Sequence, residues 1–330
     1  MRHEVNPIVG VICCLITIVG VSCSSPDVYP KGKVYFTTGD DGFYCFSTEM
    51  KFQPSQILFP LKNSQNQKRE FRNISIKGTR ELLIETEWHE YPPDYQLSLI
   101  THEWSVHHYE DNSSTWNSVF SSGKKNEYLV QTIPNQQKTV LTDGYLGFTA
   151  SPDGKLLATI DLIKNKLCIM NLKGQSPQLT YYNYPFDQHC PRPRCFSPDE
   201  SKLYFSGTVV GKPGFSIVIF DLKSSLFNIW RNGASPIISS DGNNIAYLNE
   251  SNNVVVANVM GVNQYTFNDL RVDELEQWID DRFLMALKAK TGSHGRELIV
   301  FIDMQTHRIK EFDVSKYGGI FAARFIPTAN

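Results

Sequence analysis

Histidines gather in one short segment, which makes it the first place to look for metal or acid–base chemistry. Residues 102–111 read His-Glu-Trp-Ser-Val-His-His-Tyr-Glu-Asp. On a strand, His102 and His108 would share a face, but at about 3.3 Å per residue they lie roughly 20 Å apart. His107 would point to the opposite face. A metal ion would need ligands from elsewhere, so we predict no metal here and expect an exposed, aromatic-rich insertion.

The same segment and the residues before it supply the candidate binding surface. Tyr and Trp are enriched at interfaces, and functional differences usually lie in loops on a rigid scaffold. We predict that this surface recognises a protein or a glycan, and the alternative is a packed loop. The candidate residues are Trp88, His89, Tyr91, Tyr95, His102, Trp104, His107 and His108.

A glycine-rich stretch invites a phosphate-binding interpretation, which fails. Residues 207–213 read Gly-Thr-Val-Val-Gly-Lys-Pro, one residue short of the phosphate-loop spacing, with Pro213 where Ser or Thr would bind magnesium. We predict a hairpin between two strands. The chain also lacks Gly-x-Ser-x-Gly, His-Glu-x-x-His and Cys-x-x-Cys. We therefore predict no catalytic residue and no cofactor.

Four cysteines follow the N-terminal region, and an exported chain can pair them. Cys190 and Cys195 flank Pro-Arg-Pro-Arg and form the candidate disulfide, although the prolines can equally forbid its geometry. The other two are Cys45 and Cys168. Four cysteines allow three pairings, and the sequence does not choose among them.

These residues must be positioned by a repeated unit. Three segments share a Ser-x-Asp turn between two apolar strands; Ser151 and Ser197 are 46 residues apart, and Ser197 and Ser239 are 42 apart. This is the period of a four-stranded propeller blade. The turn residues are Ser151, Pro152, Asp153, Gly154, Ser197, Pro198, Asp199, Ser239, Asp241 and Gly242.

The turn chemistry gives the three aspartates a structural role. Serine suits the first position of a tight turn, proline presets the next φ angle, and an aspartate side chain bonds turn amides. Asp153, Asp199 and Asp241 could be drawn as a ring of carboxylates, but we predict that they hold the turns.

Matching strands follow each turn. Third strands are predicted at 167–172, 215–222 and 254–259, and outer strands at 178–180, 227–230 and 265–267. The pattern resembles the WD40-like repeats of the TolB family, whose blades read Ser-Pro-Asp-Gly, strand, hairpin, strand and a short last strand. The match runs along residues 151–180, is good for 197–230 and is looser for 239–267, where Ser240 replaces proline. The resemblance covers the propeller only and implies work in the cell envelope.

Segments that match the repeat less closely predict the remaining blades of an all-β ring. One more blade is predicted from strands at 278–286, 297–303 and 309–312. Residues 73–141 form either one blade with a long insertion or two degenerate blades. Residues 320–327 resemble a first strand, whereas 33–36, 42–46 and 57–59 resemble the three strands that should follow it. We predict a six-bladed propeller, or seven-bladed if 116–141 is its own blade, closed by both chain ends in one blade.

The N-terminus predicts export and lipidation. An apolar run of about 14 residues, from Ile8 to Val21, is too short to span a membrane and suits a signal peptide. Val21-Ser22-Cys23 resembles the lipobox of bacterial lipoproteins, although Gly20 departs from the usual leucine. The resemblance implies a signal peptide at 1–22, an acylated Cys23, and a tether over 23–33 before the propeller at 34–330. Ser24 implies sorting to an outer membrane where the cell has one. An uncleaved anchor and a plain signal peptide are the alternatives.

Composition narrows the partner class. The formal net charge is −2, from 32 basic and 34 acidic residues, and the chain has no basic stripe for nucleic acid. We predict a membrane-anchored, non-enzymatic and monomeric propeller that binds an envelope protein, peptide or glycan. The alternative is a carbohydrate-active or other enzyme with its site in the propeller mouth, which would need convergent carboxylates or histidines.

Overall fold

A computed structural model gives the fold of the chain. Most of its strands come from short segments of alternating or β-branched and aromatic residues, which fit a pleated surface. The structure describes residues 29–38, 43–49, 52–56, 70–77, 81–87, 94–98, 104–107, 118–121, 128–131, 138–141, 145–153, 155–171, 178–187, 191–293 and 295–327.

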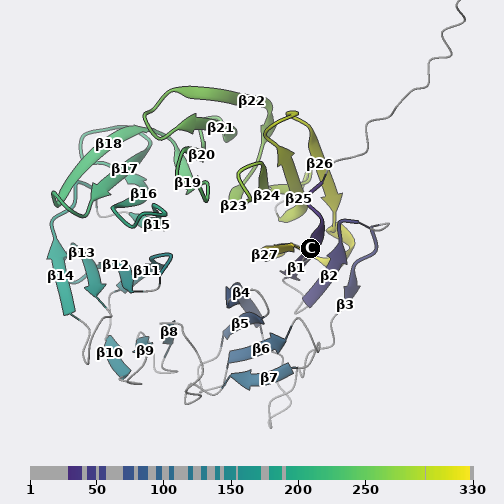
Figure 1. Cartoon of the computed structure of the whole chain (residues 1–330), viewed down its shortest axis with the longest axis horizontal. Coiled ribbons are helices and arrows are strands. Elements are labelled where there is room, and N and C mark those ends of the chain that lie inside the picture. Colours follow the sequence, from purple (N-terminus) through teal and green to yellow (C-terminus); the bar gives the residue numbers. More distant parts are fainter. Residues whose placement is uncertain are drawn as a thin grey trace, which may run out of the picture.

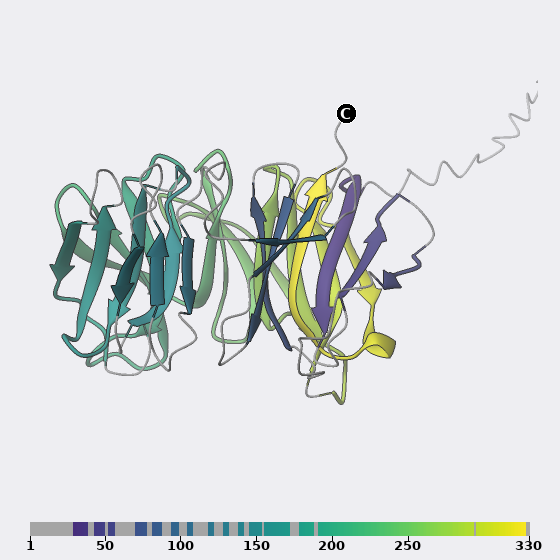
Figure 2. The same cartoon turned by 90° about the horizontal axis from the view of Figure 1, so that it is seen from below.

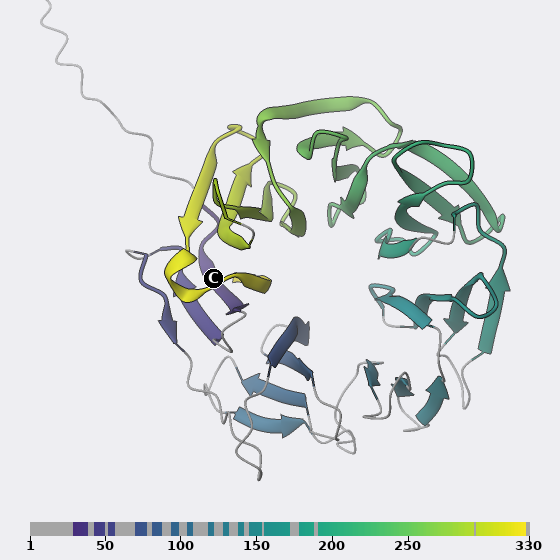
Figure 3. The ribbon, with the colours of Figure 1, turned by 180° about the vertical axis from the view of Figure 1, so that it is seen from behind.

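The described residues form seven antiparallel sheets, six of four strands and one of three, arranged around a common axis (Figures 1 and 3). Seen from the edge, they make a flat disc (Figure 2). No α-helix occurs in the described part of the chain, and the one helical element is the 3₁₀ turn η1 (Ser315–Tyr317). The chain is therefore an all-β protein.

Four sheets follow the predicted repeat, each in chain order from the axis outward (Figure 1). The first three contain the Ser-x-Asp turns between their first and second strands. The strands are β11 (Tyr145–Ala150), β12 (Leu156–Asp161), β13 (Lys166–Asn171), β14 (Gln178–Tyr182); β15 (Arg192–Phe196), β16 (Lys202–Thr208), β17 (Phe215–Asp221), β18 (Leu226–Asn232); β19 (Ala234–Ile238), β20 (Asn244–Leu248), β21 (Asn253–Asn258), β22 (Asn263–Arg271); and β23 (Glu274–Ile279), β24 (Phe283–Ala289), β25 (Arg296–Asp303), β26 (Ile309–Asp313).

The upstream segment, for which the sequence left one or two blades open, forms two separate sheets. One has four strands and the other has three. The strands are β4 (Glu70–Lys77), β5 (Glu81–Glu87), β6 (Asp94–Ser98), β7 (Trp104–His107), and then β8 (Ser118–Ser121), β9 (Tyr128–Gln131) and β10 (Lys138–Leu141).

The last sheet contains strands from both ends of the described chain. Its order is β27 (Ile320–Pro327), β1 (Gly32–Thr38), β2 (Phe43–Ser47), β3 (Ser55–Gln56). The register pairs Gly32 with Pro327 and Phe36 with Ala323. A Cβ atom on Gly32 would collide with the Ile326 carbonyl oxygen, so only glycine fits this close approach. The fourth strand predicted at 57–59 lies outside the described residues.

The turns divide the disc into two faces. Turns between first and second strands and between third and fourth strands lie side by side, because Leu222 N donates to Ser201 O at 2.9 Å and Met304 N to Arg282 O at 2.8 Å. We call this side the turn face. The central hairpins and the connections between sheets form the opposite side, the linker face, where Gly233 N donates to Phe215 O at 2.9 Å. The stretch at 207–213 is one of these hairpins, as predicted, because β16 pairs with β17.

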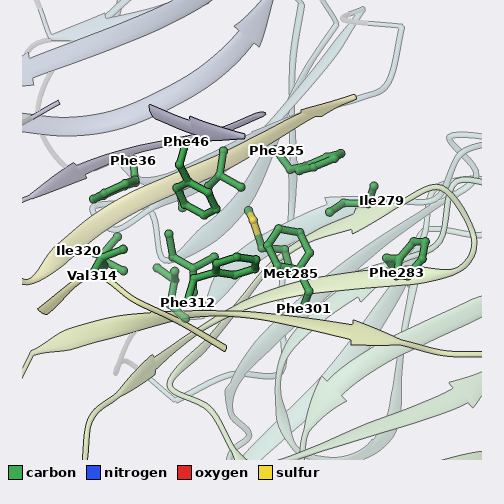
Figure 4. Close-up of a cluster of buried hydrophobic side chains, with 14 residues drawn as sticks. Phe36, Phe46, Ile279, Phe283, Met285, Phe301, Phe312, Val314, Ile320 and Phe325 are labelled. Atoms are coloured by element: carbon green, nitrogen blue, oxygen red, sulfur yellow. The ribbon is translucent and has the colours of Figure 1, made fainter. Parts of the chain in front are cut away.

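The core lies between neighbouring sheets, since a four-stranded sheet cannot bury both apolar faces alone. Figure 4 shows the cluster in which Phe36, Phe46 and Phe325 pack against Phe301 and Phe312 of the preceding sheet. Phe46 and Phe312 have ring centroids 5.0 Å apart. The sheet shared by the chain ends is thereby packed against the sheet of β23–β26.

Candidate functional site

The Ser-x-Asp turns have one hydrogen-bond pattern in three sheets. Ser239 Oγ donates to Asp241 Oδ1 at 2.5 Å and accepts from Asn244 N at 2.9 Å. Ser197 Oγ donates to Asp199 Oδ1 at 2.5 Å, and Ser151 Oγ to Asp153 Oδ1 at 2.8 Å. Each aspartate also accepts from a turn amide two residues on.

These bonds stabilise the charged form of each turn carboxylate. The hydroxyl of Ser239 lowers the pKa of Asp241 below its usual value, and that of Ser197 does the same for Asp199. A carboxylate that is hydrogen-bonded within the turn and has a lowered pKa is poorly suited to general acid–base catalysis. The turn aspartates therefore have a structural role, because they hydrogen-bond the backbone amides of the turns.

Carboxylates from one sheet also hold the turn of the sheet before it. The Glu200 carboxylate accepts from Asp153 N at 2.8 Å, and the Asp281 carboxylate accepts from Ser240 Oγ at 2.7 Å. Both contacts cross a boundary between neighbouring sheets. They link consecutive sheets along the turn face.

The sheet of β23–β26 departs from the repeat. Its first turn has only three residues, 280–282, and contains no serine. Arg282 from this turn makes two bonds to Asp303, Nε to Oδ1 at 2.9 Å and Nη2 to Oδ2 at 2.6 Å. Arg282 holds the pKa of the buried Asp303 carboxyl well below its usual value.

A pocket of about 340 Å³ opens on the turn face between this sheet and its predecessor. The Trp278 indole is fixed because Nε1 donates to Ile237 O at 3.1 Å. The Tyr265 ring stacks on His307 with centroids 3.6 Å apart. The lining residues are Asn244, Val256, Gln264, Tyr265, Trp278, Asp281, Arg282, Met304, Gln305 and His307.

The pocket offers aromatic faces and carboxamides, which suit an uncharged polar ring. Sequence reasoning missed it, because its walls come from two sheets. One local signal exists: His307 has a left-handed φ of 56°, at the place that Ser225 occupies in the equivalent turn between β17 and β18. Residues other than glycine adopt this conformation uncommonly, so a histidine there marks an unusual turn.

A second cluster lies near the axis, on three first strands and at the start of the third strand β25. Glu274 Oε2 bonds Arg296 Nη1 at 2.5 Å, and Arg194 Nη2 of β15 lies 3.4 Å from Glu274 Oε1. Glu276 Oε2 bonds Arg324 Nη1 of β27 at 2.5 Å. We call these five residues the axial cluster; they join strands from three sheets.

The axial cluster has three cationic and two acidic side chains, and most remain partly accessible. Burial raises the pKa of Glu276 above its usual value, while Arg324 opposes that shift. Glu274 and Arg296 begin their strands, so they lie toward the linker face. The cluster can bind a charged or hydrogen-bonding group that approaches along the axis from that side.

The predicted aromatic surface is only partly within the described residues. Tyr95 lies on β6, and Trp104 and His107 lie on β7, where the register sets Trp104 opposite Leu97 and His107 opposite Asp94. This places the three residues on the outer hairpin of one sheet. Trp88, His89, Tyr91, His102 and His108 lie outside the described residues, and the surface stays a prediction.

Burial disfavours the thiolate form of two described cysteines, Cys168 and Cys195. The Sγ atom of Cys195 lies 3.6 Å from Pro236 O, and burial raises the pKa of this thiol to about 12. Burial likewise raises the pKa of Cys168 to about 11. A thiol at such a pKa is a weak nucleophile. Cys190 lies outside the described residues, so its pairing stays a prediction, as does acylation of Cys23.

Two kinds of feature are absent from the described ranges. Among these residues no three His, Cys, Asp or Glu side chains are grouped as metal ligands. The described residues also contain no helix long and apolar enough to cross a membrane.

Comparison with known proteins supports the fold alone. No protein-family model and no curated protein matches the chain. A functionally unknown protein from Desulfotomaculum acetoxidans has a TM-score of 0.62 at 13% identity, covering 91% of this chain and 100% of its own. TolB from Acinetobacter baumannii has a TM-score of 0.56 at 13% identity, covering 90% of this chain and 67% of its own.

A third solved structure carries a different assignment. A Bacteroides uniformis protein provisionally assigned as a 6-phosphogluconolactonase has a TM-score of 0.55 at 12% identity, covering 90% of this chain and 100% of its own. The neighbours support a TolB-like, propeller-like fold. At these identities they assign no activity to this chain.

Proposed function

We propose that this protein is a closed, seven-bladed propeller lipoprotein of the cell envelope, which binds a protein, peptide or glycan partner without catalysing a reaction. The observation that carries the binding role is the axial cluster. Three sheets bring arginine and glutamate side chains together there, with cations in excess. Charged groups gathered on a rigid scaffold favour recognition of a complementary partner.

Seven blades and ring closure are supported by the sheet pairing. Seven sheets are described, and β27 pairs with β1 along the whole length of β1. The Gly32 contact supplies a test, because a side chain there collides with the Ile326 carbonyl. We expect Gly32→Val to lower the unfolding temperature strongly. An unchanged unfolding temperature would argue against closure through this pair.

The partner test compares two cations on the linker face. Arg296→Ala removes a cation of the axial cluster, whereas Lys290→Ala removes an exposed cation that pairs with Asp313 away from the axis. After crosslinking in the envelope, we expect Arg296→Ala to lose partner capture and Lys290→Ala to retain it. Equal capture by both variants would contradict an axial binding site.

The anchoring test is separate. The proposal rests on Val21-Ser22-Cys23 and the short apolar run before it. We expect radioactive palmitate to label the wild-type protein and not Cys23→Ala. Labelling that is independent of Cys23 would remove the lipoprotein part of the proposal.

An enzyme acting on carbohydrate is the second candidate, favoured by one observation. Glu274 and Glu276 lie two residues apart on β23, and burial raises the pKa of Glu276, as a general acid requires. Both carboxylates pair with arginines, which is why we rank this candidate second. New reducing ends released from envelope polysaccharide by the wild type, and not by Glu276→Gln, would promote it.

A further inference from the structure

The pocket on the turn face lies where the repeat changes. It is lined by residues of β20, β21 and β22 from one sheet, and by β23 and both turns of the next sheet (Figure 1). The axial cluster lies toward the linker face, so the pocket is a second site and does not depend on the proposed axial role. Its volume of about 340 Å³ is near the lower end of the roughly 300–1,000 Å³ of ligand pockets, which suits a single ring.

Two carboxamides in the wall of the pocket hold each other in place. Gln264 Nε2 donates to Asn244 Oδ1 at 2.9 Å. This leaves Asn244 Nδ2 as a donor and Gln264 Oε1 as an acceptor, and neither atom has a hydrogen-bond partner among the described residues. A donor held beside an acceptor suits hydroxyl groups, because each hydroxyl both donates and accepts. The side-chain amide of Gln305 adds a third such group to the lining.

The carboxylate of Asp281 supplies a further acceptor. Ser240 Oγ donates to its Oδ1 at 2.7 Å, and Asp241 N donates to the same oxygen at 3.1 Å. Within the described part of the chain, Oδ2 accepts no hydrogen bond. Arg282 also lines the pocket, but its guanidinium is held by Asp303 through two bonds. The carboxylate therefore adds negative charge to the pocket, which disfavours a phosphate or a carboxylate as the ligand.

Aromatic side chains form the apolar part of the wall. The Trp278 indole is held by its bond to Ile237 O, and the Tyr265 ring stacks on His307 with centroids 3.6 Å apart. The face of an aromatic ring is electron-rich, so it attracts the weakly positive C–H groups that cover one face of a pyranose ring. The hydroxyls around the edge of a pyranose then meet the carboxamides and Asp281. A purely hydrocarbon ligand would leave those polar groups without partners, at a cost in binding free energy.

We infer that this pocket binds one neutral pyranose ring of a glycan, with Trp278 against the C–H face of the ring. Asn244, Gln264 and Asp281 bond the hydroxyls of the ring. Because the pocket opens on the turn face, the rest of the glycan continues over the surface of the disc. The two sides of the disc then have different tasks, with a sugar ring bound on the turn face and the proposed charged partner bound toward the linker face.

Saturation-transfer difference NMR on the full-length protein tests the class of ligand. The probes are the methyl glycosides of glucose, galactose and mannose, each compared with the methyl glycoside of its uronic acid, in which a carboxylate replaces the hydroxymethyl group. We expect at least one neutral glycoside to bind with a dissociation constant of about 1 mM, as is usual for a ligand of this size. We expect its uronic acid to bind about tenfold more weakly, because Asp281 repels the added charge.

Matched variants locate the site. Gln264→Ala removes an exposed carboxamide of the pocket, whereas Asn268→Ala removes an exposed carboxamide further along the same strand, β22. We expect Gln264→Ala to weaken binding of the neutral glycoside about tenfold and Asn268→Ala to leave it unchanged. Asp281→Asn keeps the shape of the side chain, and we expect it to narrow the preference for the neutral glycoside over its uronic acid.

Binding of a neutral glycoside that depends on Gln264 and not on Asn268 supports the site. Equal binding by these two variants overturns it, as does equal binding of the uronic acid or a lack of binding by every sugar. In the last case, binding of N-acetyl-lysine amide would assign the pocket to a cationic side chain instead. A preference that Asp281→Asn leaves unchanged overturns the role given to that carboxylate. We expect Arg296→Ala to keep sugar binding, so the pocket and the proposed axial site can fail independently.

Discussion

The turn face and the axis use carboxylates in opposite ways. On the turn face, aspartates accept hydrogen bonds from serines, turn amides and Arg282, and the pKa values of Asp241 and Asp303 fall. At the axis, burial raises the pKa of Glu276. A lowered pKa means that folding favours the charge, and a raised one means that folding opposes it. The first group stabilises the turns, whereas the charge of the second is retained at a cost in folding free energy.

The largest expected effect comes from Asp303→Asn. Asp303 is 4% exposed and receives two bonds from Arg282, so removing its charge leaves a partly buried guanidinium unpaired. We expect a loss of about 3 kcal/mol in the free energy of unfolding at neutral pH. Urea denaturation followed by tryptophan fluorescence measures it. The matched control is Asp221→Asn in the equivalent turn, where the carboxylate bonds Ser224 and no arginine, and we expect a much smaller loss.

The same pair sets a pH dependence. The folded pKa of Asp303 lies below its unfolded value, so its stabilisation is present above the unfolded pKa and is lost as the pH falls through the folded pKa. We expect the difference between wild type and Asp303→Asn to be constant above about pH 5 and to shrink below about pH 4. Denaturation curves across this range provide the measurement. A difference that grows on acidification would contradict the assignment.

A smaller loss is expected from Ser239→Ala. Ser239 is fully buried and bonds both Asp241 and the Asn244 amide, so the alanine removes one hydrogen bond to Asp241 and takes the side-chain acceptor away from the Asn244 amide. We expect about 1–2 kcal/mol of destabilisation in urea. Ser240→Ala is the control, since it removes only the exposed bond to Asp281. Equal losses for the two serines would show that the turn network contributes little.

The smallest effect, and the one of opposite sign, is expected from Glu276→Gln. The raised folded pKa means that stability is greatest below the unfolded pKa and falls as the pH rises through the folded pKa. At neutral pH the glutamine removes a buried charge, and Arg324 keeps its bond to the Ala323 carbonyl. We expect stability to rise, by less than about 1 kcal/mol. A clear loss in urea denaturation would place Glu276 with the structural carboxylates.

The repeat explains why strand positions were predictable where the axial site was not. Third strands predicted at 167–172, 215–222 and 254–259 are observed at Lys166–Asn171, Phe215–Asp221 and Asn253–Asn258. Turn residues and alternating apolar residues act over a few positions, so they can be recognised locally. The pocket and the axial cluster join residues up to 80 positions apart, such as Arg194 and Glu274, and no local pattern records such a meeting.

Sequence by itself determined the length of each module, the place of its turns and the structural role of Ser239 and Asp241, because these depend on neighbours along the chain. Only the tertiary structure decided that Asp281 would hold the preceding sheet, that Glu276 would meet Arg324, and that Gly32 would pass the Ile326 carbonyl. Those contacts form when whole sheets pack and bury their shared apolar faces. Their partners are therefore set by the order of the sheets around the axis and by the twist that brings each against the next.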